Sequence, residues 1–439
     1  MSNNQPLRPR GRSLGSPIQH GRLPRRGPWR SIGKILALTV GVLTVSGGTV
    51  AAVAAWDVAN SVKPGVHLAH NADTPGSTAA PIADVAAITG GVSLLLTGTD
   101  TRTGQGGAYT TSSGLAASSG AGNNDVTMLL HIAENHQSVS VISFPRDLMI
   151  PVPACVQSDG SMSSASSRVM MNTTLARGGL SCVVSTIEKL TGVQIPFAAQ
   201  ISFDGVTAMS NAVGGVTVCI ASPINDLYTN PPLHLAAGQQ TIVGDEALSF
   251  LRSRKGVGDG SDLGRISNQQ VFMAALARKV ESGGVLGNPV TLYSLAKAAT
   301  SNMLLSDTLT NPTTLVQIAR ALKDTGLANM VFVQYPTIAD PQDVNRVIPQ
   351  SSGAALVNAA LIADQPITLS GLPGRAAVLD PTATPAPTAS PSPTSAATPS
   401  SSASASASAS APTPTPTVAV LPPTVTGQTA ADQTCSKGN

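Results

Sequence analysis

The chain has 439 residues, of which 11% are charged and only 3% are aromatic, and its formal net charge is +3. This length suits one large domain or two ordinary ones with tails. The four cysteines lack C-x-x-C spacing, which argues against a zinc site.

Basic residues are concentrated at the start of the chain. In residues 1–34 every ionisable side chain except His20 is cationic, and the uncharged, mostly apolar stretch Ile35–Ala55 follows. As a helix, this stretch would span roughly 30 Å, the thickness of the hydrocarbon core of a bilayer. The positive-inside rule then predicts a cytoplasmic basic arm over 1–34, one transmembrane helix over 35–56 and an extracytoplasmic remainder.

A cleavable signal peptide is the alternative for this region, because Ala52, Val53 and Ala54 resemble an A-x-A cleavage site. The apolar run is longer than a usual signal-peptide core, which favours an uncleaved anchor in the cell membrane. Nucleic-acid binding by the basic arm is disfavoured because the arm adjoins a membrane span.

Composition divides the rest of the chain into three parts. Residues 57–85 are small and polar and are predicted to form a spacer. Residues 376–439 are rich in Pro, Ser, Thr and Ala, with low complexity from about Asp380, and are predicted to be a disordered tail. Between them, residues 86–375 form the predicted globular domain.

Within this domain, short apolar runs alternate with amphipathic segments. The predicted strands are Val92–Leu96, Val126–Ile132, Val139–Phe144, Val216–Ile220 and Met330–Tyr335. The predicted helices are Cys182–Leu190, Phe203–Val213, Ile266–Val280, Pro289–Met303 and Thr313–Leu322. This alternation predicts an α/β sandwich with helices around one sheet.

Polar residues adjoin the ends of these strands. Asp100 and Arg102 directly follow the first strand, and Asp125 immediately precedes the second. Two aspartates from neighbouring loops can hold Mg²⁺ together with phosphate oxygens. The alternative is that both aspartates merely cap turns. Arg146 and Asp147 follow the third strand at the sheet edge, where a plain surface ion pair is the alternative.

The segment 244–270 concentrates cations in a thinly charged chain. Its charged and amide residues are Arg252, Arg254, Lys255, Asp262, Arg265, Gln269 and Gln270. Because a guanidinium binds phosphate through a planar fork, the segment is a candidate phosphate or pyrophosphate site. The alternative is a solvated helix end with ordinary ion pairs.

Familiar catalytic motifs are missing from the sequence. It contains no G-x-S-x-G, no H-E-x-x-H and no Walker loop, and we assign no role to the histidines. An extracytoplasmic location permits disulfides. Cys155–Cys182 is the first choice for a bridge, with two buried free thiols as the alternative, and Cys219 and Cys435 receive no predicted pairing.

Taken in chain order, these clusters resemble the LytR–CpsA–Psr family of membrane-anchored cell-wall phosphotransferases. The matching pieces are LLLTGTDTR, NNDVTMLLHI, VSVISFPRDL, MNTTLARGG, FDGVTAMSNAVGGVTVCI, GDEALSFLRSR and GSDLGRISNQQ. They run from about residue 92 to 272. The Cys155 and Cys182 pair resembles the actinobacterial branch. The resemblance implies a central mixed β-sheet flanked by helices, α-β-α, preceded by one transmembrane helix.

By resemblance, the chain transfers a glycopolymer from a polyprenyl-pyrophosphate lipid to peptidoglycan, with polyprenyl-pyrophosphatase activity as a further expectation. Asp100 and Asp125 would hold Mg²⁺, and Arg102, Arg146 and Asp147 would be catalytic. The apolar helices would form a pocket for the polyprenyl tail. The residues that would bind the pyrophosphate are Arg252, Arg254, Asp262, Arg265, Gln269 and Gln270.

Three positions depart from the family pattern. Asn123 stands where relatives usually have Arg, Met170 precedes Asn172 where they often have Lys, and Asn268 stands where they commonly have Arg. If these groups touch substrate, each loss removes about 1.5–3 kcal/mol of charged hydrogen bonding.

Two other functions are compatible with these departures. The first is a non-catalytic, membrane-tethered protein that binds polyprenyl lipids or wall glycans. The second is a structural wall anchor that works through its Pro/Ser/Thr-rich tail. The donors of arabinogalactan, capsule and teichoic acid all carry the same pyrophosphate group, so the sequence does not identify the polymer that is transferred.

Overall fold

The computed structural model describes residues 28–69, 91–106, 118, 120–157, 159–282, 285, 287–382 and 418–439. Contacts divide the chain into two compact units, Met1–Trp56 and Asp57–Asn439. Most of the predicted basic arm and spacer therefore lies outside the described residues.

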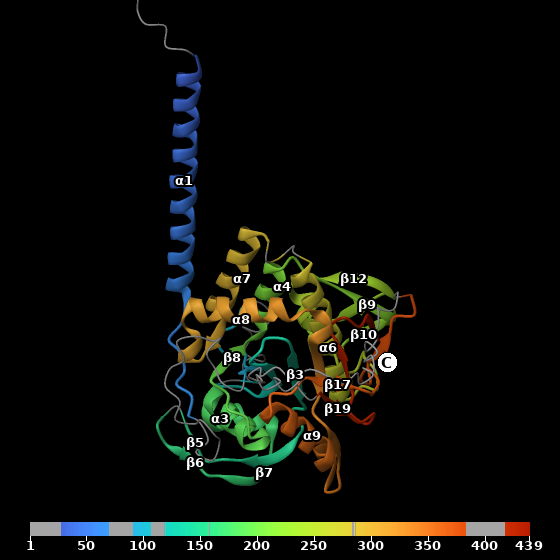
Figure 1. Cartoon of the computed structure of the whole chain (residues 1–439). Coiled ribbons are helices and arrows are strands. Elements are labelled where there is room, and N and C mark those ends of the chain that lie inside the picture. The colour runs from blue at the N-terminus through green and yellow to red at the C-terminus, as the bar shows by residue number, and fades with distance from the viewer. Residues whose placement is uncertain are drawn as a thin grey trace, which may run out of the picture. The chain divides into compact units, whose positions relative to one another are not determined.

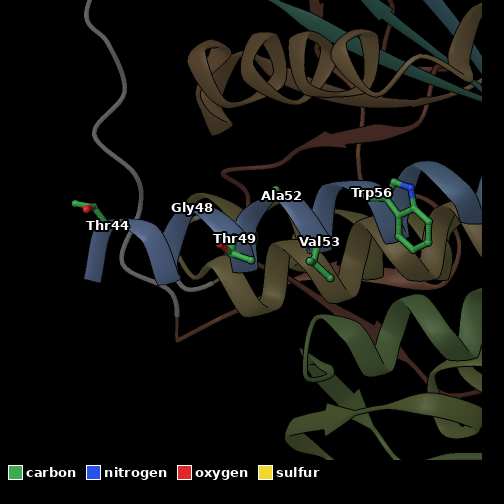
Figure 2. Close-up of a pocket in the computed structure, with 6 residues that line it drawn as sticks. All are labelled: Thr44, Gly48, Thr49, Ala52, Val53 and Trp56. Atoms are coloured by element: carbon green, nitrogen blue, oxygen red, sulfur yellow. The ribbon is translucent and has the colours of Figure 1, made fainter. Parts of the chain in front are cut away.

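The first unit contains most of helix α1 (Pro28–Ser61), which includes the apolar stretch Ile35–Ala55. Thr44, Thr49, Val53 and Trp56 of this helix line a surface pocket (Figure 2). Among the side chains that the structure describes, no helix combines the length and the apolarity needed to cross a bilayer.

The second unit is built around a seven-stranded mixed sheet. Its strands, in spatial order, are β13 (Met303–Leu305), β8 (Phe197–Ile201), β1 (Val92–Thr99), β2 (Asn124–Ile132), β3 (Val139–Phe144), β14 (Met330–Gln334) and β20 (Gly427–Thr429). The pairs β1–β8 and β3–β14 are parallel, whereas the other neighbours are antiparallel.

Helices cover both faces of this sheet (Figure 1). The helices of this unit are α3 (Thr174–Thr191), α4 (Phe203–Ala212), α5 (Gly244–Arg252), α6 (Asp262–Glu281), α7 (Pro289–Asn302), α8 (Pro312–Thr325) and α9 (Ser351–Ile362). Side chains alternate along each strand, so the sheet packs against α3 and α9 on one face and against α6 and α8 on the other. The predicted α/β sandwich around a mixed sheet is confirmed.

Alternation is clearest along β1. Leu95 belongs to the core cluster on the α3 and α9 side, whereas Leu94 and Leu96 pack in the cluster on the α6 side. The predicted helix Cys182–Leu190 begins earlier than expected, at Thr174. Gly178 and Gly179 join the two parts at a kink, and glycines at this point concealed the helical pattern.

The C-terminal residues form part of the fold, so the disordered tail predicted over 376–439 was wrong at both of its ends. A second sheet has the order β12 (Gly238–Ile242), β9 (Val216–Ser222), β21 (Thr434–Lys437) and β18 (Ala377–Leu379). β19 (Ala419–Leu421) pairs with β17 (Ile367–Leu369). Residues 383–417, which carry most of the low-complexity sequence, lie outside the described residues. Composition averaged over the whole tail masked the apolar residues at its end.

Four further two-stranded elements lie in the part of this unit that the structure describes. They are β4 (Met149–Val152) with β7 (Ser166–Met170), β5 (Cys155–Val156) with β6 (Met162–Ser163), β10 (Ile224–Asp226) with β11 (Leu233–Leu235), and β15 (Thr337–Asp340) with β16 (Asp343–Pro349).

Two disulfides link distant parts of the second unit. Cys155–Cys182 is the predicted bridge. It packs against Gly178, where a Cβ would come within 2.7 Å of the Cβ of Cys155. Cys219–Cys435, which the sequence did not predict, joins β9 to the C-terminal strand β21.

We expect the Cys219–Cys435 bridge to stabilise the fold more than Cys155–Cys182, because it closes a sequence separation of 216 rather than 27 residues. Replacing Cys219 and Cys435 by serine should lower the free energy of unfolding by about 2–5 kcal/mol. Urea denaturation of the full chain measures this. The double serine variant at Cys155 and Cys182 is the comparison, and a larger loss in that variant would contradict the ranking.

Candidate active site

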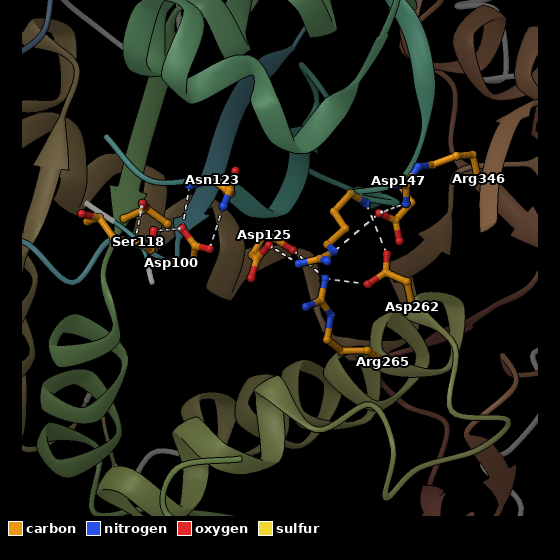
Figure 3. A network of polar contacts seen from close by, with 11 residues as sticks. Asp100, Ser118, Asn123, Asp125, Asp147, Asp262, Arg265 and Arg346 are labelled. Carbon is orange, nitrogen blue, oxygen red and sulfur yellow. Dashed lines mark hydrogen bonds and ion pairs between the residues drawn. The ribbon is translucent and has the colours of Figure 1, made fainter. Parts of the chain in front are cut away.

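The candidate site lies at one end of the central strands, where β1 ends and β2 begins. This side of the sheet, formed by strand ends and the loops that follow them, is called the sheet edge. Thr99 of β1 is paired with Asn124 of β2, so Asp100 and Asp125 project from adjacent positions on that edge. The loop after β3 brings Arg146 and Asp147 to the same edge, and α6 contributes Asp262 and Arg265 (Figure 3). Residues predicted from four separate motifs therefore meet in one place.

Asp100 is held rigidly at this edge. Its carboxylate accepts hydrogen bonds from the Ser118 hydroxyl at 2.8 Å, from the Asn123 backbone N–H at 2.6 Å and from the Asn123 side-chain amide at 2.9 Å. Asn123 therefore orients a carboxylate. Arg102 is half-buried in the same loop, and its backbone N–H donates to the Ser118 carbonyl at 3.1 Å.

Asp125 contacts two arginines. Its carboxylate pairs with the Arg146 guanidinium at 2.5 Å, and its backbone carbonyl accepts a hydrogen bond from Arg265 at 2.8 Å. Arg265 also pairs with Asp262 at 2.6 Å, and both of these side chains are buried. Burial makes this pairing necessary, since a buried charge without a partner is strongly destabilising.

Local sequence explains why Asp262 and Arg265 face the site. Ser261 caps α6 by accepting a hydrogen bond from the Gly264 N–H, so Asp262 lies in the first turn, where the helix dipole favours a carboxylate. Arg265 lies one turn further along the same face. Asp262 also accepts a hydrogen bond from the Arg146 backbone N–H at 3.2 Å, which joins α6 to the loop after β3.

Asp147 lies between two arginines. Its carboxylate is 3.7 Å from Nε of Arg146 and 3.2 Å from Nη1 of Arg346. Arg346 belongs to β16 and was missed by sequence reasoning, because it stands alone in a short strand far along the chain from the motifs. Only the fold brings it to the site.

Burial and neighbouring charges shift the pKa values of Asp147 and Arg146. Burial, and then the negative charge of Asp262, raise the pKa of Asp147, while Arg146, Arg346 and Arg254 oppose that rise. Burial alone would lower the pKa of Arg146. The carboxylates of Asp125, Asp147 and Asp262 outweigh this effect and raise that pKa, so Arg146 stays charged.

Arg252 and Arg254 lie at the end of α5. The guanidinium of Arg252 lies 4.2 Å from the centre of the Phe203 ring, a cation–π contact. The loop that carries Arg254 is shaped by Asp226, another residue that the sequence did not single out. The buried Asp226 carboxylate accepts hydrogen bonds from the Ser253 hydroxyl at 2.7 Å and from the Arg254 and Gly256 N–H groups at 3.1 and 3.0 Å.

An apolar cavity of about 320 Å³ adjoins these charges. It lies between the sheet and helices α4, α5, α6 and α7, and Asp125, Arg252, Arg265 and Gln269 line it together with apolar side chains. The apolar lining consists of Leu96, Val126, Met128, Ile201, Phe203, Val206, Met209, Val213, Val216, Leu248, Leu251, Phe272, Met273, Leu276, Val280, Leu295 and Met303. The cavity therefore combines a large apolar volume with a small group of charged and amide side chains.

The two glutamines and Asn268 differ in position. Gln269 lines the cavity and donates to the Leu251 carbonyl at 2.9 Å, whereas Gln270 is buried outside that lining. Asn268 is fully buried. It donates to the Phe250 carbonyl at 2.7 Å and accepts from the Ser436 hydroxyl at 2.6 Å. The side chain of Asn268 thus holds the C-terminal strand β21.

Comparisons with known proteins agree with this fold. The family model described as the LytR_cpsA_psr family matches residues 63–357. Cell wall biosynthesis protein LcpA of Corynebacterium glutamicum is 26% identical over 274 residues, which is 58% of this chain and 52% of LcpA. The chain thus spans about half the length of that relative.

Two further proteins are similar to this chain. A Bacillus cereus protein named polyisoprenyl-teichoic acid–peptidoglycan teichoic acid transferase TagU is 28% identical, over 60% of this chain and 76% of TagU. The crystal structure of protein gbs0355 from Streptococcus agalactiae has a TM-score of 0.50 at 22% identity and covers 62% of this chain and 87% of that one. The latter likeness concerns the fold.

Asp226 provides a test of how the arginine loop is held. Burial would raise the pKa of Asp226, but hydrogen bonds from Ser253, Tyr228, Gly256 and Arg254 lower it below its ordinary value of 3.8. The ionised carboxylate therefore stabilises the fold at neutral pH, and this contribution is lost as the pH falls through the lowered pKa.

We expect Asp226→Asn to lower the free energy of unfolding by about 1–3 kcal/mol at pH 7. The difference from the wild type should shrink as the pH falls below 3.8, the ordinary value. Urea denaturation at both pH values measures this. Asp159→Asn is the matched control, because Asp159 is exposed and hydrogen-bonded to Ser161. It should change stability by less than about 0.5 kcal/mol. Equal effects of the two substitutions would contradict the role of Asp226.

Proposed function

Because the chain belongs to the LytR–CpsA–Psr family, we propose that it transfers a glycopolymer from a polyprenyl-pyrophosphate lipid carrier to peptidoglycan. The product is a phosphodiester link in cell-wall assembly. The printed name of the similar TagU describes a transfer of this kind, from a polyisoprenyl carrier to peptidoglycan.

The observation that carries this proposal is the apolar cavity beside the arginines. A polyprenyl pyrophosphate has a long apolar chain ending in a compact anion, so it needs an apolar volume with cations at one place on its wall. The cavity supplies both, through its aliphatic lining and through Arg252 and Arg265. Burial of apolar surface contributes about 25 cal/mol per Å², so the tail supplies much of the binding energy.

The charged residues have distinct roles in this proposal. Arg252, Arg254 and Arg265 bind the pyrophosphate oxygens, and Gln269 positions them. Arg146 balances negative charge as the phosphoryl group is transferred, while Arg102 approaches from the loop that holds Asp100. Phosphoryl transfer depends mainly on positioning and charge neutralisation, which arginines in a partly dry site provide.

Mg²⁺ is compatible with the donor set at the sheet edge. Among the residues that the structure describes, the one group of three converging ligand atoms is Cys219, Asp380 and Cys435, whose cysteines form a disulfide. The site instead offers the two carboxylates of Asp100 and Asp125. Mg²⁺ is commonly held by one or two carboxylates, several waters and substrate phosphate, so these two would hold it. When bound, Mg²⁺ would neutralise phosphate charge.

Non-catalytic binding of polyprenyl lipids or wall glycans is the second candidate. The observation that favours it is the missing cations at Asn123 and Met170, since Asn123 is occupied by hydrogen bonds to Asp100. A binding protein would retain the lipid and depend on Arg252 or Arg254, but would show no turnover. Measured turnover therefore separates the two candidates.

We expect the full chain in detergent to transfer glycan from a polyprenyl-pyrophosphate-linked oligosaccharide to soluble peptidoglycan strands. Arg146→Gln should lower the rate by about 10–100-fold, because a charged hydrogen bond contributes about 1.5–3 kcal/mol. Mass spectrometry of the glycan–peptidoglycan product measures the rate. The control is Arg320→Gln, on the exposed surface of α8, which should leave the rate unchanged. Full activity of Arg146→Gln would refute the catalytic assignment.

Removal of Mg²⁺ by a chelator should abolish transfer, and added Mg²⁺ should restore it. Asp125→Asn should raise the Mg²⁺ concentration required for half-maximal rate by about tenfold or more. Titration of the rate with Mg²⁺ measures this shift, and Asp159→Asn serves as the control. Undiminished transfer in the presence of the chelator would remove Mg²⁺ from the proposal.

Membrane anchoring through residues 35–56 is also part of this proposal, with the N-terminus in the cytoplasm. Exposed apolar side chains along α1 support it, namely Leu36, Leu38, Val40, Val53 and Trp56. The full chain should sediment with membranes and retain an N-terminal epitope tag, whereas a chain starting at Asp57 should be released. Loss of the tag from the mature protein would instead favour the cleaved signal peptide.

A further inference from the structure

A line of alternating charges runs from the cavity to the protein surface. Asp125, which lines the cavity, pairs with Arg146, which lies beside Asp147, which in turn contacts Arg346 (Figure 3). The Arg346 side chain is 32% exposed, whereas that of Asp147 is 12% exposed. The side chains of Asp125 and Arg146 are 21% and 24% exposed, so Asp147 is the most buried of the four and Arg346 the most exposed.

The two ends of this line suit different substrates. The apolar cavity at the Asp125 end has the chemistry to take the lipid donor. A peptidoglycan acceptor is a polar polymer too large for that cavity, so it must approach from the solvent end. The side chains on that approach are those of Asp147 and Arg346, because Arg346 is the most exposed member of the line.

The β15–β16 hairpin holds Arg346 at this position through several contacts. Val347 forms a bridge with Leu148, and its N–H donates to the Asp147 carbonyl at 3.3 Å. At the turn of the hairpin, Asp340 forms an ion pair with Arg168 of β7. Arg346 is also 3.7 Å from Asp343 in the same strand. The backbone of the hairpin is thus fixed to the residue whose carboxylate Arg346 contacts.

The charged groups that shift the pKa of Asp147 come from four elements. Arg146 precedes it in the loop after β3, Asp262 lies in α6, Arg254 follows α5, and Arg346 lies in β16. Burial and Asp262 favour the protonated carboxyl, whereas the three arginines favour the carboxylate. Arg146 also interacts with Asp125 and Asp262, whereas the ion pairs of Arg346 among the described residues are with Asp147 and Asp343.

We propose that Arg346 is a positioning residue that holds Asp147 as the base for the acceptor hydroxyl, and that the acceptor enters beside the β15–β16 hairpin. This inference rests on the proposed transfer function. The acceptor hydroxyl oxygen forms a bond to the phosphorus that carries the glycan. The bridging P–O bond breaks, and polyprenyl phosphate leaves with the electron pair. The hydroxyl proton passes to the Asp147 carboxylate.

The test compares Arg346→Gln, Arg346→Lys and wild type as full chains in detergent. The probes are a polyprenyl-pyrophosphate-linked oligosaccharide and soluble peptidoglycan strands, and the transfer rate is measured from pH 5.5 to 9. Without Arg346, the carboxylate of Asp147 forms less readily at low pH. At pH 6 we expect the transfer rate of Arg346→Gln to be roughly fivefold below that of the wild type, which is the size of effect that loss of one partly exposed ion pair produces. At high pH the rate should approach that of the wild type.

Lysine should restore most of the loss, because it keeps the charge. Donor binding should be unchanged in Arg346→Gln, since Arg346 does not line the cavity. Arg375→Gln is the matched control, because Arg375 forms an exposed ion pair with Asp259 at 2.7 Å. Its pH profile should follow that of the wild type. Thermal unfolding confirms that each variant is folded.

Three results would overturn the inference. They are an unchanged rate in Arg346→Gln, an equal loss at every pH, and a loss of donor binding. The last would make Arg346 a ligand of the donor phosphate. Failure of the proposed function is distinguishable, because the wild type itself would then bind donor without transferring it. In that case, a ¹³C NMR titration that finds the Asp147 carboxyl unaffected by Arg346→Gln would overturn the positioning role as well.

Discussion

The buried ion pair between Asp262 and Arg265 is the interaction on which the rest of the site depends. Taking two charges out of water is unfavourable unless each meets further partners. Here Asp262 also accepts a hydrogen bond from the Arg146 backbone, and Arg265 also donates to the Asp125 carbonyl. These partners fix the start of α6 against β2 and the loop after β3. The need to satisfy one pair therefore determines how three elements meet at the sheet edge.

This arrangement also places an apolar lining beside charged side chains. Aliphatic residues of α4, α5, α6 and α7 line a cavity, yet Arg252 and Arg265 lie in the same lining. A guanidinium is more weakly hydrated than an ammonium, so it tolerates such a boundary better than lysine. Arg252 gains further support from the Phe203 ring. A ligand with an apolar chain and an anionic head fits these conditions, and a uniformly polar glycan does not.

Sequence patterns predicted those parts of the molecule that depend on local order. The strands Val139–Phe144 and Met330–Tyr335 and the helix Ile266–Val280 were found because their hydrophobic periods are regular. Asp226 and Arg346 were not predicted as site residues, because their roles arise from contacts between distant segments. Spacing in the sequence does not indicate such contacts. Asn268 is a third residue of this kind. Its partners, Phe250 and Ser436, become neighbours only when the C-terminal strand enters the second sheet.

Because the C-terminal residues form strands of the fold, the low-complexity segment joins two ordered parts of the domain. Residues 383–417 connect β18 to β19, so both ends of the segment are held within the same unit. A protease that cuts this segment would leave the C-terminal strand covalently attached through Cys219–Cys435. The C-terminal strand would therefore stay attached to the second sheet even if the continuity of this segment were lost.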